Sequence, residues 1–539
     1  MYIQPTPAVY PLGALLLESN RRAAWRNSRN KVASLPVVFA DQALLVDGWA
    51  DDVRLDVRDG IVAAIETGVE PASGDTAVGI VLPGLANAHS HAFQRALAGH
   101  TEARSPAGRD NFWSWRERMY ALAASIDAAA LQAIARQVYG EMLAAGYTAV
   151  AEFHYLHRPA GAAVLDDSMF EALRRAAEET GIRLTYVPVL YERAGFDADT
   201  PDERQRGFVL SLDEFLDHHA AAAARAGGLV TVGIGAHSLR AVGEASLRAI
   251  AAARDRDMPL HIHIAEQRRE VEQCLATLGR RPVRWLMEQF EVDEHWCLVH
   301  ATHMDFDEVE RLAASKAVVC LCPSTEANLG DGLFPLADYL AADGRIAIGS
   351  DSHVSINPYE ELRWLEYGQR LASRSRNVAA LRDSHVGSEL YRRALAGGAQ
   401  ALGGIRRGDS QSDDIQQGVR QADIQQGELQ QRALHRGAAR RDDIPRRGIQ
   451  QRDSHVGGAQ AGLAVGSPAD LVCFYADDAM FSGHGDASRL DALVFSGYRL
   501  PIDRVMVAGV WRVVDGLHVE REPTRRAFAA TLERIGVQP

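Results

Sequence analysis

Residues 79–91, GIVLPGLANAHSH, contain the pattern that decides the fold of this chain. A short apolar run leads through a Pro-Gly turn to two histidines, and Ala-rich helical stretches separate this run from similar ones. Eight such strand-then-helix units predict a parallel (β/α)8 barrel, which we expect over residues 83–403, with functional residues at the carboxyl ends of the strands. The other seven strand segments are YTAVAEFHY, RLTYVPVLY, LVTVGIGAHS, PLHIHIAEQ, WCLVHATH, AVVCLCPS and IAIGSDSH.

The two ends of the chain share a different pattern. Residues 37–82 form short alternating segments broken by Asp-Gly turns, and residues 462–520 return to this style in GSPADLVCFYA and VMVAGVWRVVDG. Alternation of this kind is typical of β-strands with one buried face. We therefore expect one small β-sandwich domain built from both chain ends, and a C-terminal helix over residues 521–539.

Two further segments fit neither domain. Residues 1–36 are rich in Arg and Asn, and we expect a disordered extension there; a transit peptide and a start site placed too far upstream are the alternatives. Residues 404–461 repeat DIQQG and contain no Phe, Trp or Tyr. Because such a composition cannot bury enough apolar surface to offset the entropy of ordering, we expect a disordered insertion, with a binding tail as the alternative.

The composition restricts the classes of partner. The net charge of −13, from 58 basic and 71 acidic residues, disfavours a nucleic-acid surface. No apolar run approaches the roughly 18 residues that a membrane span needs. Five cysteines do not make a disulfide framework, which favours a reducing cytoplasm. Cys320 and Cys322 alternate as in a buried strand, and we prefer that interpretation to a zinc-thiolate site.

Two of the predicted strands carry a His-x-His pair, His89 with His91 and His261 with His263. Residues two apart in a strand point to the same side, so such a pair can offer both imidazoles to one ion. A single pair is weak evidence, because histidines also pack in protein cores. The first pair ends the first barrel strand, whereas we expect His261 to be a packed histidine or a residue that supports the ligands.

Three other strand ends carry polar groups that suit the same site. Glu266 follows the strand LHIHI, His300 ends WCLVH, and Asp351 ends IAIGS. At one rim of a barrel, His89, His91, His263 and Asp351 would surround one divalent ion, with Glu266 and His300 beside it. Zinc suits nitrogen and oxygen ligands of this kind and can lower the pKa of a water to about 7. The pattern therefore predicts a metal-dependent hydrolase.

The tetrapeptide Asp-Ser-His-Val occurs three times, starting at Asp351, Asp383 and Asp453. Only Asp351 follows an apolar strand. Asp383 lies in a polar connection, where Asp and Ser serve as turn or helix-start residues. Asp453 lies in the repeat-like insertion, within a copy of residues 382–387. We therefore expect only the first of the three copies to carry chemistry.

Longer motifs connect these residues to a known family. They include NAHSHAFQRALAGHTE, FWSWRERMY, GAHSLRAV, HIHIAEQRREVEQCL, CPSTEANLGDGLFP and GSDSHVSINPYEELRW. From about residue 39 to about residue 516, apart from the insertion, the chain resembles the amidohydrolase superfamily, and within it the formimidoylglutamate deiminases. The resemblance implies one zinc ion per subunit on the four residues named above, cytoplasmic histidine degradation, and a homodimer. It also implies substrate contacts at Gln94, Arg116, Tyr155, His237 and Arg240.

The resemblance further implies a mechanism and a substrate class. Asp351 would take a proton from the attacking water, His300 would orient that water, and Glu266 would protonate the imine nitrogen so that ammonia leaves. A glutamate derivative has two carboxylates, which arginine forks bind bidentately. Two alternatives stay open: a deaminase of a purine-like ring, of the guanine deaminase type, and a non-catalytic scaffold impaired by the insertion.

Overall fold

The computed structural model describes residues 37–104, 108, 110–196, 200–201, 203–255, 257–381, 384–404, 462–497 and 499–537. The expected extension over 1–36 and almost all of the expected insertion over 404–461 lie outside these residues. So do Asp383 and Asp453, so their expected lack of a role stays a prediction.

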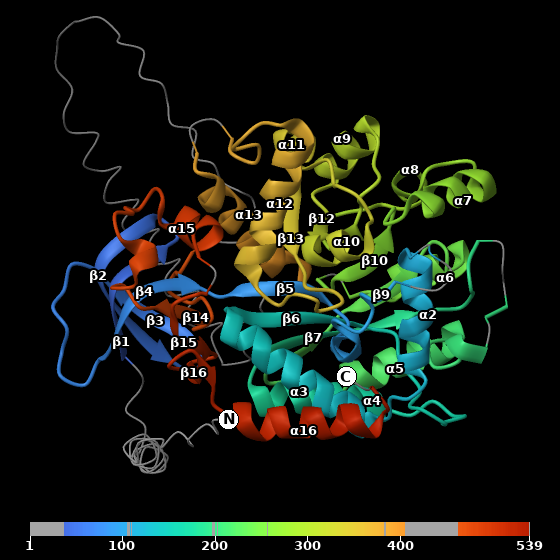
Figure 1. Cartoon of the computed structure of the whole chain (residues 1–539), viewed down its shortest axis with the longest axis horizontal. Helices are drawn as coiled ribbons and strands as arrows, with labels where there is room; N and C mark the ends of the chain where they lie inside the picture. Colours follow the sequence, from blue (N-terminus) through green and yellow to red (C-terminus); the bar gives the residue numbers. More distant parts are fainter. Residues whose placement is uncertain are drawn as a thin grey trace, which may run out of the picture.

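Eight parallel strands form the expected barrel, and helices surround it (Figure 1). The central strands are buried along their whole length, as parallel strands covered by helices must be. Each of the eight predicted strand segments contains a barrel strand, so the predicted fold is confirmed. The strands are β5 (Leu85–Ser90), β6 (Tyr147–His154), β7 (Arg183–Leu190), β9 (Ile234–Ser238), β10 (Leu260–Ile264), β11 (Trp296–His300), β12 (Val318–Leu321) and β13 (Arg345–Ile348), with β8 (Val230–Val232) paired to β7.

Several of the helices around the barrel begin and end at recognisable signals. For example, the Asp127 side chain caps the first turn of α3, and Gly146 ends that helix with a left-handed backbone, φ 101°. The helices are α2 (Phe112–Ala123), α3 (Ala128–Ala145), α4 (Ser168–Thr180), α5 (Leu212–Ala223), α6 (Glu244–Ala253), α7 (Arg268–Leu278), α8 (Pro282–Gln289), α9 (Phe306–Ser315), α10 (Pro323–Leu329), α11 (Leu336–Ala341), α12 (Pro358–Ser373) and α13 (Val386–Ala401), with 3-10 turns η1 (Ala92–Leu97) and η2 (Glu203–Gln205).

The barrel closes between its first and last strands. Ser90 and Asp351 form an isolated parallel bridge, in which the Asp351 N–H donates to the His89 carbonyl at 3.0 Å and the His91 N–H donates to the Asp351 carbonyl at 3.1 Å. The chains approach so closely here that a Cβ on Gly349 would lie 2.8 Å from the Cβ of His89, so this position requires glycine. The seam of the barrel is therefore built from the candidate site residues themselves.

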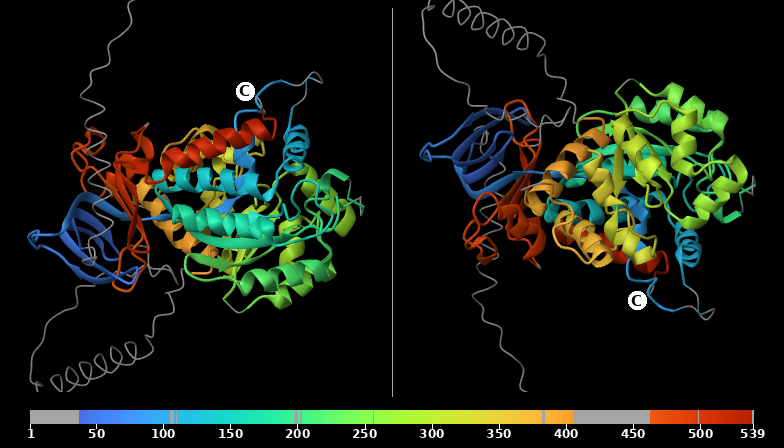
Figure 2. Two further views of the ribbon diagram at one scale, coloured as in Figure 1. Left: turned by 90° about the horizontal axis from the view of Figure 1, so that it is seen from below. Right: turned by 90° about the horizontal axis from the view of Figure 1, so that it is seen from above.

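Both chain ends contribute to a second sheet beside the barrel, as predicted. Figure 2 shows the blue N-terminal strands next to the red C-terminal strands, at one side of the barrel. By hydrogen bonding the eight strands form one sheet, and a separate apolar core that includes Val38, Leu55, Leu471 and Met506 joins the two chain ends. In sheet order the strands are β17 (Leu517–His518), β16 (Val510–Val514), β15 (Ile502–Val507), β14 (Leu471–Phe474), β4 (Thr76–Pro83), β1 (Val37–Leu45), β2 (Gly48–Arg58) and β3 (Ile61–Glu66).

The remaining elements are the 3-10 turn η3 (Ala479–Phe481), α15 (Arg489–Phe495) and the C-terminal helix α16 (Arg521–Arg534). Helix α16 packs along α3, and Figure 1 shows the two side by side. Among the residues that the structure describes, no helix has the length and apolar character that crossing a bilayer requires.

Candidate metal centre and active site

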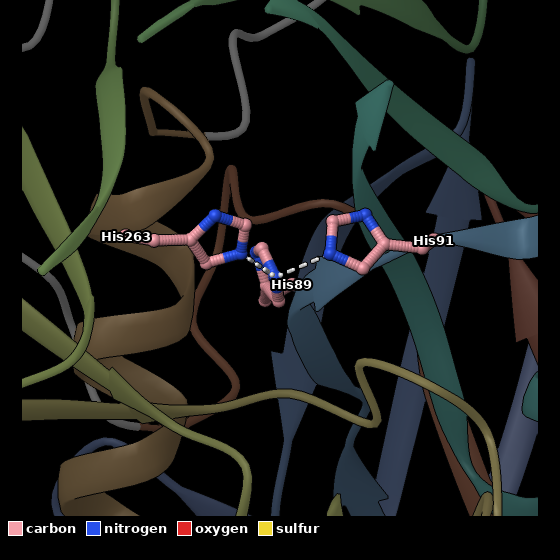
Figure 3. A group of neighbouring side chains, drawn as sticks. All are labelled: His89, His91 and His263. Atoms are coloured by element: carbon pink, nitrogen blue, oxygen red, sulfur yellow. Dashed lines mark hydrogen bonds between the residues drawn. The ribbon is translucent and has the colours of Figure 1, made fainter. Parts of the chain in front are cut away.

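Three buried imidazoles meet at the carboxyl end of the barrel. His89 lies in β5, His91 directly follows that strand, and His263 lies in β10 on the other side of the barrel. The Nε2 atom of His89 is 3.1 Å from Nε2 of His91 and 3.0 Å from Nε2 of His263 (Figure 3). The alternation of side chains in the two strands thus brings together the three histidines that the sequence singled out.

The outer hydrogen bonds of these histidines define which nitrogen faces the centre. Nδ1 of His91 lies 2.8 Å from the Phe153 carbonyl, and Nδ1 of His263 lies 3.0 Å from the His237 carbonyl. Each Nδ1 therefore carries the proton that it donates, which leaves a lone pair on the inward Nε2. Burial lowers the pKa of His91 to about 3 and holds the pKa values of His89 and His263 well below the usual range.

His91 and His263 both turn a lone pair toward Nε2 of His89, and a single proton on that nitrogen could be donated to only one of them, so a cation between the rings satisfies the arrangement better. Two nitrogens that are each about 2.0–2.1 Å from one zinc ion can be at most about 4.2 Å apart, and the observed separations are well inside that limit. His89, His91 and His263 could hold a metal ion, and so could the group of His89, His300 and Asp351. The donor set therefore fits a divalent metal.

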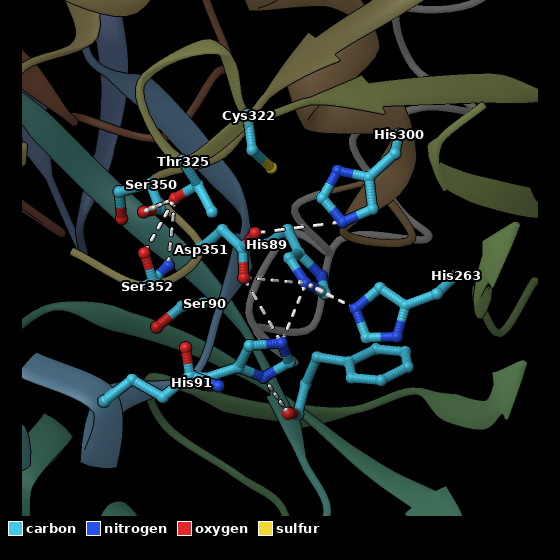
Figure 4. Close-up of polar contacts among 12 residues, drawn as sticks. His89, Ser90, His91, His263, His300, Cys322, Thr325, Ser350, Asp351 and Ser352 are labelled. Carbon is cyan, nitrogen blue, oxygen red and sulfur yellow. Dashed lines mark hydrogen bonds and ion pairs between the residues drawn. The ribbon is translucent and has the colours of Figure 1, made fainter. Parts of the chain in front are cut away.

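Asp351 approaches the histidines from the seam. Its Oδ1 lies 3.3 Å from Nε2 of His91 and 3.6 Å from Nε2 of His89, and its Oδ2 lies 3.8 Å from Nε2 of His300 (Figure 4). The residue has a left-handed backbone, φ 48°, which the bridge to Ser90 holds in place. Burial raises the pKa of this carboxyl to about 7 against the opposing charge of His300; a neighbouring cation would favour the ionised form.

His300 lies among carboxylates. Its Nδ1 is 3.1 Å from Oε1 of Glu326, and its Nε2 is 3.9 Å from Oε1 of Glu266. Burial alone would lower the pKa of His300, but Glu266, Glu326 and Asp351 together raise it to about 10. The same Oε1 of Glu326 accepts the N–H of Cys322 at 2.9 Å, so the partner of His300 is itself fixed. Sequence reasoning gave Glu326 no role, because nothing in the motif CPSTEAN indicates its distant partner.

A pocket opens from this cluster toward solvent. It is lined by the cluster residues His91, His263, Glu266, His300 and Asp351. All five residues that the resemblance assigned to substrate line it as well: Gln94, Arg116, Tyr155, His237 and Arg240. Aromatic side chains form its walls. Phe112, Trp115 and Tyr120 of α2 belong to the motif FWSWRERMY but had no predicted role, and Tyr191 and Phe208 were not singled out.

Two arginines in this pocket have a buried Nε–H group that makes no hydrogen bond to the described part of the protein. Within the described part of the chain, the Nε atoms of Arg116 and Arg240 are both buried and lack a hydrogen bond. The Arg116 guanidinium stacks 4.4 Å from the ring centre of Trp113, which orients it without using its donors. Buried donors usually find acceptors, so these two arginines suit an anionic ligand.

The remaining predicted contacts are also close to the cluster. Gln94 donates from Nε2 to the Tyr155 hydroxyl at 2.9 Å, and its Oε1 is buried without a partner among the described residues. His237, whose carbonyl holds His263, lies with its ring 5.4 Å from that of Tyr155. Oriented amide and imidazole groups of this kind can hold the polar middle of a small ligand.

Other candidates from the sequence lie elsewhere. His261 is not among the histidines of the cluster; it is completely buried and its Nε2 lies 2.8 Å from the Ala401 carbonyl, as expected for a packed histidine. All five cysteines are buried and free, with Cys320 in β12. Cys322 is the residue before α10, so the predicted strand pattern ends one residue earlier than expected.

Comparison with known proteins gives the same family from independent stretches of the chain. The profile of the amidohydrolase family matches residues 80–403, which is more than half of the chain. The chain belongs to the amidohydrolase family. The profile of the N-terminal domain of formimidoylglutamate deiminase HutF matches residues 35–78.

Individual members of the family differ in how similar they are to this chain. Formimidoylglutamate deiminase from Pseudomonas aeruginosa is 43% identical, over 93% of this chain and 100% of its own length. 8-Oxoguanine deaminase from the same species is 28% identical, over 85% of this chain and 89% of its length. A crystal structure of an amidohydrolase from Brucella melitensis superposes with a TM-score of 0.79 at 36% identity and covers 93% of this chain and 99% of that one. The chain is accordingly a hydrolase that acts on C–N bonds. The amidohydrolase family is typically metal-dependent, and the buried histidine cluster could hold such a metal.

Proposed function

We propose that this chain is a formimidoylglutamate deiminase, which hydrolyses N-formimidoyl-L-glutamate to N-formyl-L-glutamate and ammonia in histidine degradation. The observation that carries the proposal is the pocket in which the His and Asp cluster faces two arginines whose buried Nε atoms make no hydrogen bond within the described part of the chain. A linear amidine on a molecule that also carries two carboxylates matches both halves of that pocket. The similarity to the Pseudomonas aeruginosa deiminase along the whole chain supports the same substrate.

The metal in this proposal is one zinc ion per subunit, held by His89, His91, His263 and Asp351. Three imidazole nitrogens and one carboxylate oxygen are ligands that zinc accepts, although other divalent metals also bind such sets. When bound, the metal supplies Lewis acidity, which makes water a nucleophile near neutral pH.

Different side chains around the metal carry out the separate proton-transfer steps. Asp351 takes a proton from the attacking water as its oxygen bonds to the formimidoyl carbon. His300, held by Glu326, orients that water through Nε2. Glu266 donates a proton to the imine nitrogen, which gives a tetrahedral intermediate with one hydroxyl and one amino group. The amino nitrogen then receives the proton that Asp351 took from water, the hydroxyl proton returns to Glu266, and the C–N bond breaks to release ammonia. Atoms balance, because one water is consumed and its oxygen remains in the formyl group.

The rest of the pocket positions the substrate. Arg116 and Arg240 bind the two carboxylates through charge-assisted hydrogen bonds, and the aromatic walls exclude water from these contacts. Gln94, Tyr155 and His237 contact the formimidoyl group. An acidic chain with a net charge of −13 thereby binds a dicarboxylate through locally concentrated positive charge.

The organisation of the molecule is part of the proposal. Residues 83–403 would form the catalytic domain, with residues 37–82 and 462–520 forming the second one. We propose a cytoplasmic homodimer; the five buried free thiols fit a reducing compartment. Light scattering on the purified protein measures the mass in solution, and a monomeric mass contradicts the dimer.

Ammonia release from formimidoylglutamate, guanine and 8-oxoguanine tests the proposed function. We expect turnover of formimidoylglutamate alone, both in the full chain and in a variant without residues 404–461. Faster release from either purine would replace the proposal by a ring deaminase, for which the 28% identical relative is the precedent. A zinc-loaded protein that releases ammonia from none of them would favour the scaffold.

A further inference from the structure

A buried carboxylate outside the proposed catalytic set contacts two parts of the site at once. Glu270 lies in the first turn of α7 and is completely buried. Its Oε1 accepts the Ala265 N–H at 3.0 Å, and its Oε2 accepts the Glu266 N–H at 3.2 Å. The same Oε2 lies 3.8 Å from Nε of Arg240. One side chain therefore contacts the backbone of the proposed proton donor and the side chain of a proposed substrate-binding arginine.

The turn that Glu270 holds contains a residue with an unfavourable backbone conformation. Ala265 has a φ of 51°, a left-handed conformation that residues with a Cβ seldom adopt. This turn directs the chain away from β10 and brings Glu266 into the pocket. Such a conformation persists only where surrounding contacts fix it. The two hydrogen bonds from Glu270 fix the turn on one side, and the His303 N–H, which donates to the Ala265 carbonyl at 3.0 Å, fixes it on the other.

The guanidinium of Arg240 is shared between two carboxylates. Its Nη2 lies 3.6 Å from Oε2 of Glu266, and its Nε lies near Glu270 as described. Among the described residues these two glutamates are its only ion-pair partners within 4.0 Å. Arg240 is itself buried, 7% exposed, so neither charge is screened strongly by water. Removing the charge of Glu270 leaves Glu266 as the single carboxylate that attracts the guanidinium.

We infer that Glu270 is a positioning residue that keeps Arg240 available to a substrate carboxylate and keeps Glu266 directed at the reacting group. The inference rests on the proposed function and deepens it, because it links the recognition of a dicarboxylate to the placement of the proton donor. Without the negative charge at position 270, Arg240 turns toward Glu266, so that substrate binding and proton transfer both weaken.

A purely structural role for Glu270 makes a different prediction. A carboxylate that only supports the start of α7 would change the melting temperature and the amount of folded protein. It would leave KM and kcat of the folded fraction unchanged, and its effect would not depend on Arg240. The kinetic split and its dependence on Arg240 therefore separate the two roles.

The experiment compares Glu270→Gln with the full-length zinc-loaded parent, at equal zinc content. The exposed Glu272 of the same helix provides the matched control Glu272→Gln. We expect Glu270→Gln to raise KM for formimidoylglutamate about ten-fold or more and to lower kcat as well, in line with the loss of one charged contact. Glu272→Gln should match the parent. Glu270→Asp keeps the charge and should recover part of the loss in KM if the shorter side chain still reaches Arg240.

The double variant Glu270→Gln with Arg240→Met tests the route of the effect. If Glu270 acts on binding through Arg240, its effect on KM shrinks to about two-fold or less once Arg240 is gone. Two substrate analogues test the same point. N-formimidoyl-γ-aminobutyrate lacks the α-carboxylate of the substrate, and N-formimidoyl-norvaline lacks the side-chain carboxylate. The effect of Glu270→Gln on KM should be lost for the analogue that lacks the carboxylate bound by Arg240. An undiminished effect on KM in the Arg240→Met background overturns the inference, as do parent-like kinetics of Glu270→Gln.

A readout without substrate separates this inference from the proposed function. Hydrogen exchange, measured by mass spectrometry on the peptide that contains Ala265 and Glu266, should become faster in Glu270→Gln and stay parent-like in Glu272→Gln. A parent that releases no ammonia from formimidoylglutamate refutes the proposed function but leaves this measurement intact. Unchanged exchange in Glu270→Gln refutes the positioning of Glu266, whatever the substrate is.

Discussion

His91 and Asp351 are connected twice across the seam of the barrel. The His91 N–H donates to the Asp351 carbonyl at 3.1 Å, and the side chains approach to 3.3 Å between Nε2 and Oδ1. The backbone contact closes the fold, whereas the side-chain contact belongs to the candidate metal site. Changes to the carboxylate should therefore affect chemistry much more than folding.

Asp351→Asn tests this separation. The amide keeps the size of the side chain and the backbone bridge to Ser90, but it loses the negative charge and the ability to take a proton. We expect at least a hundred-fold lower kcat, about the size of a lost acid–base group, reduced zinc affinity, and a circular dichroism spectrum like that of the parent. Asp343→Asn, at an exposed carboxylate, is the control. Near-normal ammonia release by Asp351→Asn would exclude Asp351 as the base.

Glu266→Gln should separate proton transfer from metal binding. The carboxylate is buried, lies 3.9 Å from His300, and is not one of the proposed ligands. We expect the zinc content of the parent with a loss in kcat of about 10²–10⁴-fold, the usual contribution of a positioned general acid. Zinc content by atomic emission and ammonia release on the same sample provide the measurement. Retained zinc with near-normal turnover would show that another group protonates the leaving nitrogen.

Arg240→Met should weaken the transition state for dicarboxylate substrates. Methionine fills similar space but cannot pair with a substrate carboxylate, so kcat/KM should fall by roughly ten- to two-hundred-fold, the value of one charge-assisted hydrogen bond. The matched control is Arg248→Met, because Arg248 is an exposed arginine paired with Glu244. Equal kinetics of the two variants would place Arg240 outside the substrate contacts.

The parts of the site that follow a local pattern could be predicted from the sequence. His89, His91, His263 and Asp351 lie at the ends of apolar strands, and a parallel barrel gathers strand ends at one rim whatever the details of its packing. Period-two alternation also predicts that the His263 side chain points to the opposite face of its strand from the residues directly before and after it. These residues are therefore visible before any coordinates are known.

Contacts between distant elements could not be predicted in this way. Glu270 lies in the segment QRREVEQ, whose charges are typical of a solvated helix start, and its partner Arg240 is thirty positions earlier. The role of Glu326 is likewise visible only from its contact with His300 on the neighbouring strand. Trp115 reaches the pocket because α2 folds across the mouth of the barrel. For pocket residues outside the metal cluster, the sequence pattern alone made no prediction; only the resemblance to a family implied some of them.

Glu361 should make the stability of the protein depend on pH. It is completely buried in α12, where Ser324 donates to it from the hydroxyl at 2.6 Å and from the backbone N–H at 2.9 Å. Burial raises its pKa from 4.5 to about 8, although the bonds from Ser324 oppose the shift. The folded state therefore keeps a proton that the unfolded state releases. Its contribution to stability is complete below pH 4.5 and is lost as the pH rises toward 8.

Urea unfolding of the parent and of Glu361→Gln between pH 5 and pH 9 measures this contribution. The slope for one proton is at most about 1.4 kcal/mol per pH unit. We expect the free energy of unfolding of Glu361→Gln, relative to that of the parent, to increase with pH up to about pH 8 and then to stay level. Glu272→Gln, at an exposed position, should show no such trend. A difference that does not change with pH would mean that Glu361 is ionised in the folded protein.

Removal of the metal should affect both activity and stability, because the histidine cluster is a poor arrangement without a cation. Nε2 of His89 lies 3.1 Å from that of His91 and 3.0 Å from that of His263, and one proton on it could be donated to only one of these two neighbours. Burial lowers the pKa of His91 and His263, so these rings are neutral and free to bind a cation. A ligand that binds only the folded state raises its stability by mass action. Dialysis against a chelator should therefore abolish ammonia release and lower the melting temperature. One equivalent of zinc per chain should restore both.

His263→Ala serves as a comparison, because a chain that lacks one ligand should melt at nearly the same temperature with and without the metal. A chelated sample with parent-like activity, at a zinc content far below one per chain, would refute a metal-dependent mechanism.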